Sequence, residues 1–144
     1  MLPDFDDDGF LPKGKHHVTL DEFAKRFVYF DMSDQRFRLF EKFKRLCEEA
    51  RRSGIVRHIL VGGSFVTSKP EPNDFDCVVV LDPSIAGHDL VPMEYNLASR
   101  RMACRLFGGD IFPVVDGSLE HHRFLNLFQS TRGGERVGIV EIDL

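Results

Sequence analysis

Residues 61–76, with the sequence VGGSFVTSKPEPNDFD, carry the pattern that decides the predicted fold. Apolar runs at 55–61 and 75–81 flank this stretch, which indicates two strands joined by a loop. Two glycines form a tight turn near its start, and Asp74 and Asp76 lie at its end. Side chains at positions i and i+2 of a strand point to the same face. We therefore expect both carboxylates to project together and Phe75 to face the core.

The paired carboxylates predict a metal site. Carboxylates held side by side repel each other and raise each other's pKa unless a cation relieves them. Their oxygens suit Mg²⁺, which keeps several waters and bridges protein carboxylates to substrate phosphates. Gly62 and Gly63 let a phosphate approach the backbone closely, and Ser64 adds a hydroxyl. Lys69, in the loop that follows, is a further candidate phosphate ligand.

The spacing of these features resembles a known signature. Gly63-Ser64, nine intervening residues and then Asp74-x-Asp76 on an apolar strand is similar to the motif of the polymerase-beta-like nucleotidyltransferases. The resemblance implies an α/β (α+β) fold with a mixed β-sheet of about four strands flanked by helices. It also implies a third carboxylate on the neighbouring strand, and Asp110, which opens the apolar run 110–115, matches it. Two Mg²⁺ ions, with Mn²⁺ as an alternative, would bind Asp74, Asp76 and Asp110.

Three further stretches, at 8–14, 63–70 and 138–144, together resemble an uncharacterised bacterial family of single-domain nucleotidyltransferase-like proteins. That resemblance implies transfer of an NMP from an NTP such as ATP to a hydroxyl of a protein or RNA, within a toxin-antitoxin or defence system. No second helical domain follows the core, so a partner protein or a homodimer mate is expected to bring the acceptor.

Two alternatives stay open: a non-catalytic nucleotide- or partner-binding module on this fold, and a structural interaction protein with a Phe-rich surface.

Composition favours one globular unit. The 144 residues are 42% hydrophobic and 29% charged, which is typical of one globular domain, here predicted over 19–144. Prolines and glycines among acidic residues predict an irregular arm over 1–18. No apolar run reaches membrane-spanning length and no signal peptide pattern is present, so a cytoplasmic location is expected. A net charge of −4 carries no strong nucleic-acid signature. Three dispersed cysteines are expected to be reduced and mostly buried.

Helical periodicity predicts helices over 20–29, 93–107 and 119–129, and a longer helix that Ser33 caps and Gly54 ends. Alternation of apolar and polar residues predicts a final strand at 137–144. In the second helix, Arg36 is expected to face solvent, and the apolar stripe comprises Phe37, Phe40, Phe43, Cys47 and Ala50. One of Arg100, Arg101 and Arg105 is expected to reach the phosphates. Pro113 predicts an edge strand or a bulge.

Histidines give weaker signals. The adjacent residues His16 and His17 point in different directions, and no third metal ligand is close to them in the sequence, so we expect surface or arm packing. His121 and His122 in the last predicted helix are interpreted as solvent or interface residues. No Gly-x-Ser-x-Gly elbow or Ser-His-Asp pattern is present, so serine hydrolase chemistry is not expected.

Overall fold

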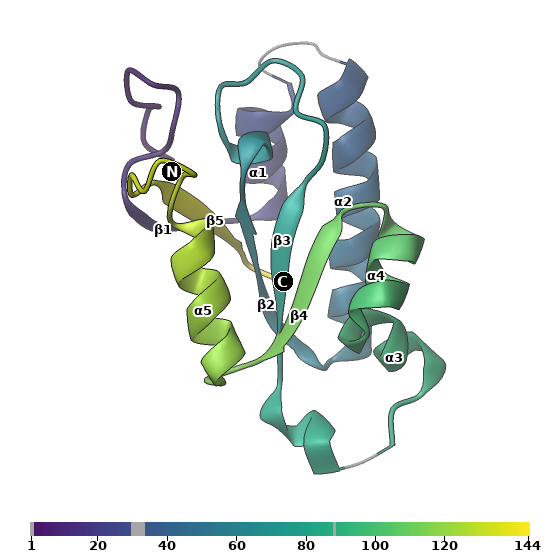
Figure 1. The fold of residues 1–144 in the computed structure, drawn as a ribbon. Helices are drawn as coiled ribbons and strands as arrows, with labels where there is room; N and C mark the ends of the chain where they lie inside the picture. Colours follow the sequence, from purple (N-terminus) through teal and green to yellow (C-terminus); the bar gives the residue numbers. More distant parts are fainter. Residues whose placement is uncertain (1, 30–33, 88) are drawn as a thin grey trace.

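A computed structural model describes residues 2–29, 34–87 and 89–144 (Figure 1). Its centre is a mixed five-stranded sheet in the order β1-β5-β2-β3-β4. Strand β2 is antiparallel to β3 and β5, whereas β1–β5 and β3–β4 are parallel pairs. The predicted α/β class with a mixed sheet flanked by helices is confirmed. The strands are β1 (Gly14–Val18), β2 (Val56–Gly62), β3 (Asp76–Leu81), β4 (Asp110–Val115) and β5 (Gly138–Ile142).

Helices cover the two faces of the sheet unequally. In Figure 1, α1 and α2 lie behind the sheet and α5 lies in front of it. The large core behind the sheet includes buried residues of α1 to α4, and α5 packs on the smaller cluster formed by Leu60, Val78, Val80, Val114 and Ile139. The helices are α1 (Leu20–Phe27), α2 (Asp34–Ser53), α3 (Pro92–Ala98), α4 (Arg100–Phe107) and α5 (Leu119–Phe128), with 3₁₀ turns η1 (Ser64–Val66) and η2 (Pro83–Gly87).

The fifth strand corrects the predicted N-terminal arm. Residues 14–18 form β1, paired in parallel with β5, so only the part of the arm before residue 14 lacks a helix or strand. The sequence GKHHV contains a single apolar residue, Val18, which hides the strand from a pattern search. Its pairing partner lies more than a hundred residues further along the chain, and no local signal reports such a partner.

Helix α2 buries a different stripe from the predicted one. Phe37 is 49% exposed, and Arg36 is fully buried with Leu39, Phe40 and Leu46. Extending the 3.6-residue period back from Phe40 reaches position 36, not 37, so the arginine occupies a core position. The predicted cap at Ser33 lies outside the described residues.

The predicted helix over 93–107 is two helices. Ser99 has extended dihedral angles, φ −95° and ψ 118°, which end α3, and its side chain then accepts a hydrogen bond from the Met102 amide to cap α4. Serine is favoured at this position because its hydroxyl satisfies an orphan N–H of the first turn. The break places Arg100 in the first turn of α4, beside β4.

Strand β3 sets the direction of the candidate site. Cys77 and Val79 point into the large core and Val78 and Val80 into the smaller one, as expected for a strand covered on both faces. The alternation puts Asp76 on the α5 face, at the open end of the sheet. Pro113 lies in β4, which is an edge strand as predicted.

Candidate metal and nucleotide site

Three carboxylates meet at one end of the sheet. Asp76 begins β3 and lies in register with Asp110 at the start of β4 on one side and with Gly62 at the end of β2 on the other. Asp110 alternates with Phe112 and Val114, so it shares the α5 face with Asp76. Asp74 lies exposed in the loop two residues before β3. The structure thus brings together the three residues that the sequence singled out.

The closeness of the three carboxylates affects the pKa of Asp76. Burial, together with the negative charges of Asp110 and Asp74, raises the pKa of Asp76 to about 6. Desolvation and like charges both disfavour the ionised form, and a bound cation relieves both effects. An all-carboxylate donor set with room for water suits Mg²⁺ or Mn²⁺ better than softer metals. The chemistry of the three side chains therefore fits the implied metal ions, although their oxygens do not all lie within 4.8 Å of one another.

The glycine turn lies directly against the carboxylates. Gly63 has a left-handed φ of +71°, and a β-carbon at this position would overlap Oδ2 of Asp76. Ser64 then opens the 3₁₀ turn η1, as predicted. A β-carbon at Gly62 would contact the Phe128 ring of α5. Both glycines are therefore required by close packing around the site.

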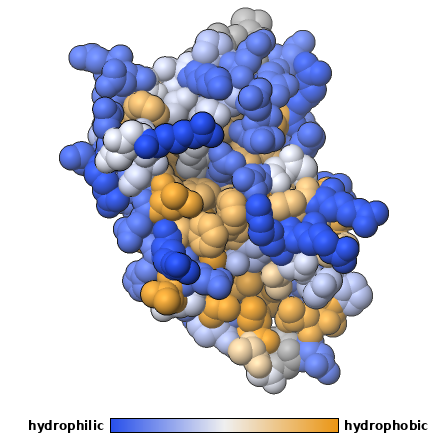
Figure 2. Space-filling view, viewed as in Figure 1, coloured by the Kyte–Doolittle hydropathy of each residue, from blue (hydrophilic) through white to orange (hydrophobic). Residues whose placement is uncertain are grey.

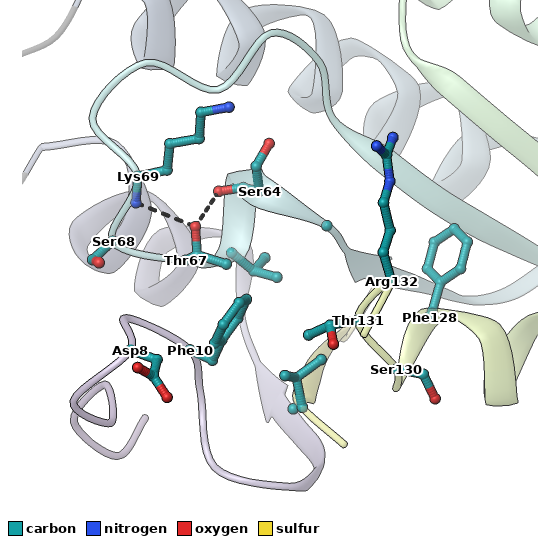
Figure 3. A pocket seen from close by; sticks show the side chains of 14 residues that line it. Asp8, Phe10, Ser64, Thr67, Ser68, Lys69, Phe128, Ser130, Thr131 and Arg132 are labelled. Atoms are coloured by element: carbon teal, nitrogen blue, oxygen red, sulfur yellow. Dashed lines mark hydrogen bonds between the residues drawn. The ribbon is translucent and has the colours of Figure 1, made fainter. Parts of the chain in front are cut away.

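Two cavities meet at this turn. A cavity of about 380 Å³ contains Asp76 and Asp110, and its other walls are Gly63, Phe112, Leu127, Phe128, Ser130 and Arg132. A second cavity of about 460 Å³ extends past Ser64 and Lys69 toward Asp8 and Phe10 of the N-terminal segment (Figure 3). Gly63, Phe128, Ser130 and Arg132 line both cavities. The acidic cluster and the Ser64 turn thus share one continuous recess.

Cationic side chains border this recess. In Figure 3 the Lys69 ammonium, the Arg132 guanidinium and the Ser64 hydroxyl point to the same side. Arg132 belongs to the turn between α5 and β5, which is closed by hydrogen bonds from the Thr131 amide to the Glu135 carbonyl and from the Val137 amide to the Gln129 carbonyl. In the sequence, Arg132 directly precedes the pair Gly133-Gly134, and this pattern could have indicated a cation presented on a turn.

Arg36 shapes the loop that carries Ser64 and Lys69. Its guanidinium donates hydrogen bonds to the carbonyls of Phe27 (2.8 Å), Phe65 (2.7 Å), Thr67 (2.7 Å) and Lys69 (3.2 Å from Nε). Three of these acceptors lie within the loop after Gly63. A buried arginine with several charge-assisted bonds holds irregular backbone in one conformation. No residue pattern indicates this role, because the acceptors are backbone atoms and three of the four are 29 to 33 residues away.

Arg100 is the helix arginine that reaches the site. Its Nη2 lies 2.9 Å from Asp110 Oδ1, its Nη1 donates to the Ile111 carbonyl at 2.9 Å, and the guanidinium carbon lies 3.9 Å from the centroid of the Phe112 ring. The expectation was a contact to phosphates. In the structure Arg100 pairs with the third carboxylate instead.

The fold and site define an α/β protein with an acidic cluster at adjacent strand ends beside a glycine turn. Residues 3–143 match the model of a family of unknown function (DUF6932), and the chain belongs to that family. No curated protein and no solved structure matches the chain. Among residues 2–29, 34–87 and 89–144, no helix is both long and apolar enough to cross a membrane.

Proposed function

We propose that this protein is a metal-dependent nucleotidyltransferase that transfers an NMP from an NTP to a hydroxyl of a protein or RNA. One observation carries the proposal: Asp76 and Asp110 line an open recess beside the Gly63–Ser64 turn, and Asp74 lies close enough to raise the pKa of Asp76. The cytoplasmic location and the toxin-antitoxin or defence role that the sequence suggests belong to the same hypothesis.

The three carboxylates are assigned to the metal ions. Burial, and then the charges of Asp110 and Asp74, raise the pKa of Asp76, so this side chain gains most from a bound cation. When bound, Mg²⁺ supplies neutralisation of phosphate charge and lowers the pKa of the attacking hydroxyl. Asp74 is exposed and reaches solvent, so it is suited to meet an incoming metal–nucleotide complex.

The turn and the bordering cations are assigned to the triphosphate. Gly63 has no side chain to block approach, and the Ser64 hydroxyl, Lys69 and Arg132 line the larger cavity next to it. Cations and hydroxyl donors around a concave apolar wall suit a nucleotide with charged phosphates. Arg36 fixes the carbonyls of Phe65 and Thr67, which keeps this phosphate-binding loop in one shape without touching the ligand.

The acceptor has room on the opposite side of the carboxylates. A groove of about 500 Å³ between α5 and β4 shares Phe112 and Leu127 with the acidic cavity and extends to Arg100 and Arg123. In Figure 2 apolar side chains gather in the middle of this face. A nucleotide in the recess beside Ser64 and an acceptor hydroxyl in this groove would meet at Asp76 and Asp110.

The alternative, a non-catalytic module on the same fold, predicts nucleotide binding without transfer. A third carboxylate turned away from the other two would favour this alternative. Asp110 instead lies in register with Asp76 and contributes to its raised pKa, which favours the enzyme.

Transfer of label is the decisive test. The protein and a cell extract are incubated with each α-labelled NTP and Mg²⁺, and the wild type is compared with the isosteric variant Asp74→Asn/Asp76→Asn. We expect label on one class of macromolecule with the wild type and none with the variant. Absence of labelling with every NTP, combined with Mg²⁺-dependent NTP binding in calorimetry, supports the binding module. Absence of both refutes the proposed function.

A further inference from the structure

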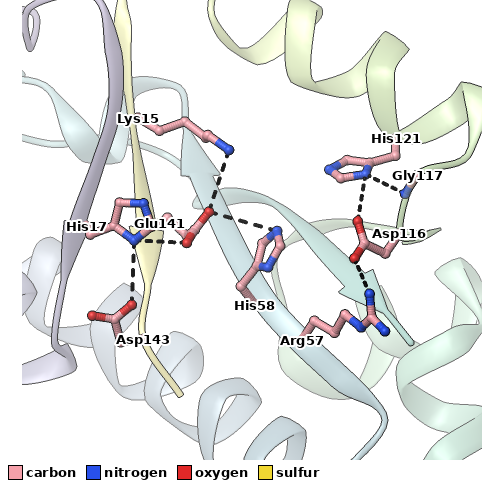
Figure 4. A network of polar contacts seen from close by, with 9 residues as sticks. All are labelled: Lys15, His17, Arg57, His58, Asp116, Gly117, His121, Glu141 and Asp143. Carbon is pink, nitrogen blue, oxygen red and sulfur yellow. Dashed lines mark hydrogen bonds and ion pairs between the residues drawn. The ribbon is translucent and has the colours of Figure 1, made fainter. Parts of the chain in front are cut away.

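A second cluster of charged and imidazole groups lies on β1 and β5 (Figure 4). Glu141 alternates with Ile139, so the cluster lies on the α5 face of the sheet. His17 of β1 is in register with Glu141 of the parallel strand β5, and Asp143 follows two residues later. The Asp143 amide donates to the Val18 carbonyl, which continues the pairing past the end of β5. Parallel register therefore brings one imidazole and two carboxylates together on one face.

The three donor atoms have the spacing of a metal site. His17 Nδ1 lies 2.9 Å from Glu141 Oε2 and 3.7 Å from Asp143 Oδ1, and all three donor atoms lie within 4.8 Å of one another. Zinc bonds to nitrogen and oxygen are about 2.0–2.2 Å long, so ligand atoms of a tetrahedral site are roughly 3.3–3.5 Å apart. The observed distances bracket that spacing without a change of backbone.

We propose that His17, Glu141 and Asp143 form a binding site for Zn²⁺, distinct from the Mg²⁺ site at Asp74, Asp76 and Asp110. The imidazole nitrogen makes the difference, because Mg²⁺ prefers oxygen ligands and Zn²⁺ accepts mixed nitrogen and oxygen sets. Three protein ligands leave the fourth position to water. His17 and Asp143 are both exposed, so an ion reaches the site from solvent.

The two carboxylate oxygens of Glu141 face different partners. Its Oε1 lies 3.8 Å from both Lys15 Nζ and His58 Nε2, whereas Oε2 faces His17. Glu141 is only 8% exposed, so its carboxylate is oriented by its surroundings. Lys15 and His58 lie too far from Oε1 for hydrogen bonds, and the charge of Lys15 opposes a bound cation instead of supporting it. The cluster thus has a donor set in which burial orients the Glu141 carboxylate, with Oε2 directed at the proposed ion.

His16 provides a matched control. It is the neighbour of His17 in β1 and projects away from the cluster, where its Nε2 lies 2.7 Å from the Pro12 carbonyl oxygen. Adjacent residues of a strand point to opposite faces. Replacing His16 removes an imidazole from the same strand without touching the three proposed ligands.

The test is a Zn²⁺ titration of the full chain by calorimetry at pH 7.5, with millimolar Mg²⁺ present to occupy the other carboxylate site. Co²⁺ is used in parallel, since its visible absorption reports coordination by nitrogen and oxygen. We expect one equivalent of Zn²⁺ to bind the wild type and His16→Ala, and at least tenfold weaker binding in His17→Ala and Asp143→Asn. Circular dichroism verifies folding, and the exposure of His17 makes a fold defect easy to exclude.

Two outcomes overturn the proposal. One is an identical Zn²⁺ titration for the wild type and both ligand variants, which would place the ion elsewhere, for example at the carboxylates beside Gly63 or at a cysteine. The other is no Zn²⁺ binding by the wild type, which would leave the cluster as an ion-pair network. Asp74→Asn/Asp76→Asn separates the two sites, because it is expected to keep the Zn²⁺ equivalent that His17→Ala loses.

Discussion

The guanidinium of Arg100 lies 2.9 Å from the carboxylate of Asp110, at the position where the proposed function requires a metal ligand. The arginine is also anchored by the Ile111 carbonyl and the Phe112 ring. It therefore serves as an internal counter-cation in the metal-free protein. Under the proposed function, a metal ion has to share Asp110 with this arginine or displace it, and that competition would make Arg100 a determinant of metal affinity.

Replacing Arg100 with methionine is expected to strengthen divalent metal binding. The change removes a positive charge beside Asp110 and leaves the carboxylates less compensated, so Mn²⁺ should bind several-fold more tightly. The pair is about half exposed, so its loss should destabilise the fold by no more than about 1 kcal/mol. Calorimetry with Mn²⁺ measures the affinity, and Arg101→Met, an exposed change on the same helix, is the control. Unchanged or weaker binding contradicts the competition.

Asp76 makes stability depend on pH in a defined direction. Its pKa is raised in the fold to about 6, so folding favours the protonated form, and stability falls as pH rises from about 4 to 6. The penalty is then fully present above pH 6. Asp76→Asn should raise the melting temperature at pH 8, corresponding to roughly 1–2 kcal/mol after allowance for partial exposure. The gain should almost vanish near pH 4, and an equal gain at both pH values refutes this cause.

Removal of the buried arginine is expected to be severe. Arg36→Met leaves the carbonyls of Phe27, Phe65, Thr67 and Lys69 without their donor, at about 1–3 kcal/mol for each buried group. We expect the free energy of unfolding to fall by at least about 3 kcal/mol in urea denaturation. Arg38→Met, on the exposed face of the same helix, should change it by less than about 0.5 kcal/mol. Similar values for the two variants would contradict the assigned role.

Gly63→Ala tests the close approach of the turn to Asp76. The variant pays for a left-handed φ of +71° and also forces a methyl group against Asp76 Oδ2. Gly54→Ala has the same φ of +71° and open space around the added methyl group, so it pays the backbone cost of about 1–2 kcal/mol alone. Gly63→Ala should be the more destabilising in thermal melts, and only it should weaken Mn²⁺ binding. Equal effects on both properties would show that the contact is unimportant.

The sequence was sufficient to predict those elements that a short pattern of neighbouring residues indicates. The alternation around Phe75 and Asp76 and the apolar runs of β2 to β5 were readable because each is a short periodic pattern. The core-facing Phe75 was predicted correctly on that basis. The acidic strand start at Asp110 was recognised only through the family resemblance.

Contacts between residues that are distant in the sequence could not be predicted from the sequence. Strand β1 depends on pairing with β5, and three of the four carbonyls that Arg36 binds are 29 to 33 residues away. The dismissal of His17 as a metal ligand rested on the absence of a nearby third donor, and Glu141 and Asp143 are distant in the sequence but adjacent in the sheet. In each case the partner is set by strand register or by backbone atoms, which residue types do not encode.

The position of β5 between β1 and β2 also governs the order in which the molecule can be completed during synthesis. Until residues 138–142 leave the ribosome, β1 has no strand beside it and β2 has one unpaired edge. Closing such a distant pairing is slow and leaves a strand edge exposed meanwhile. A nascent chain would therefore already carry Asp74, Asp76 and Asp110 before the sheet that positions them is completed by β5.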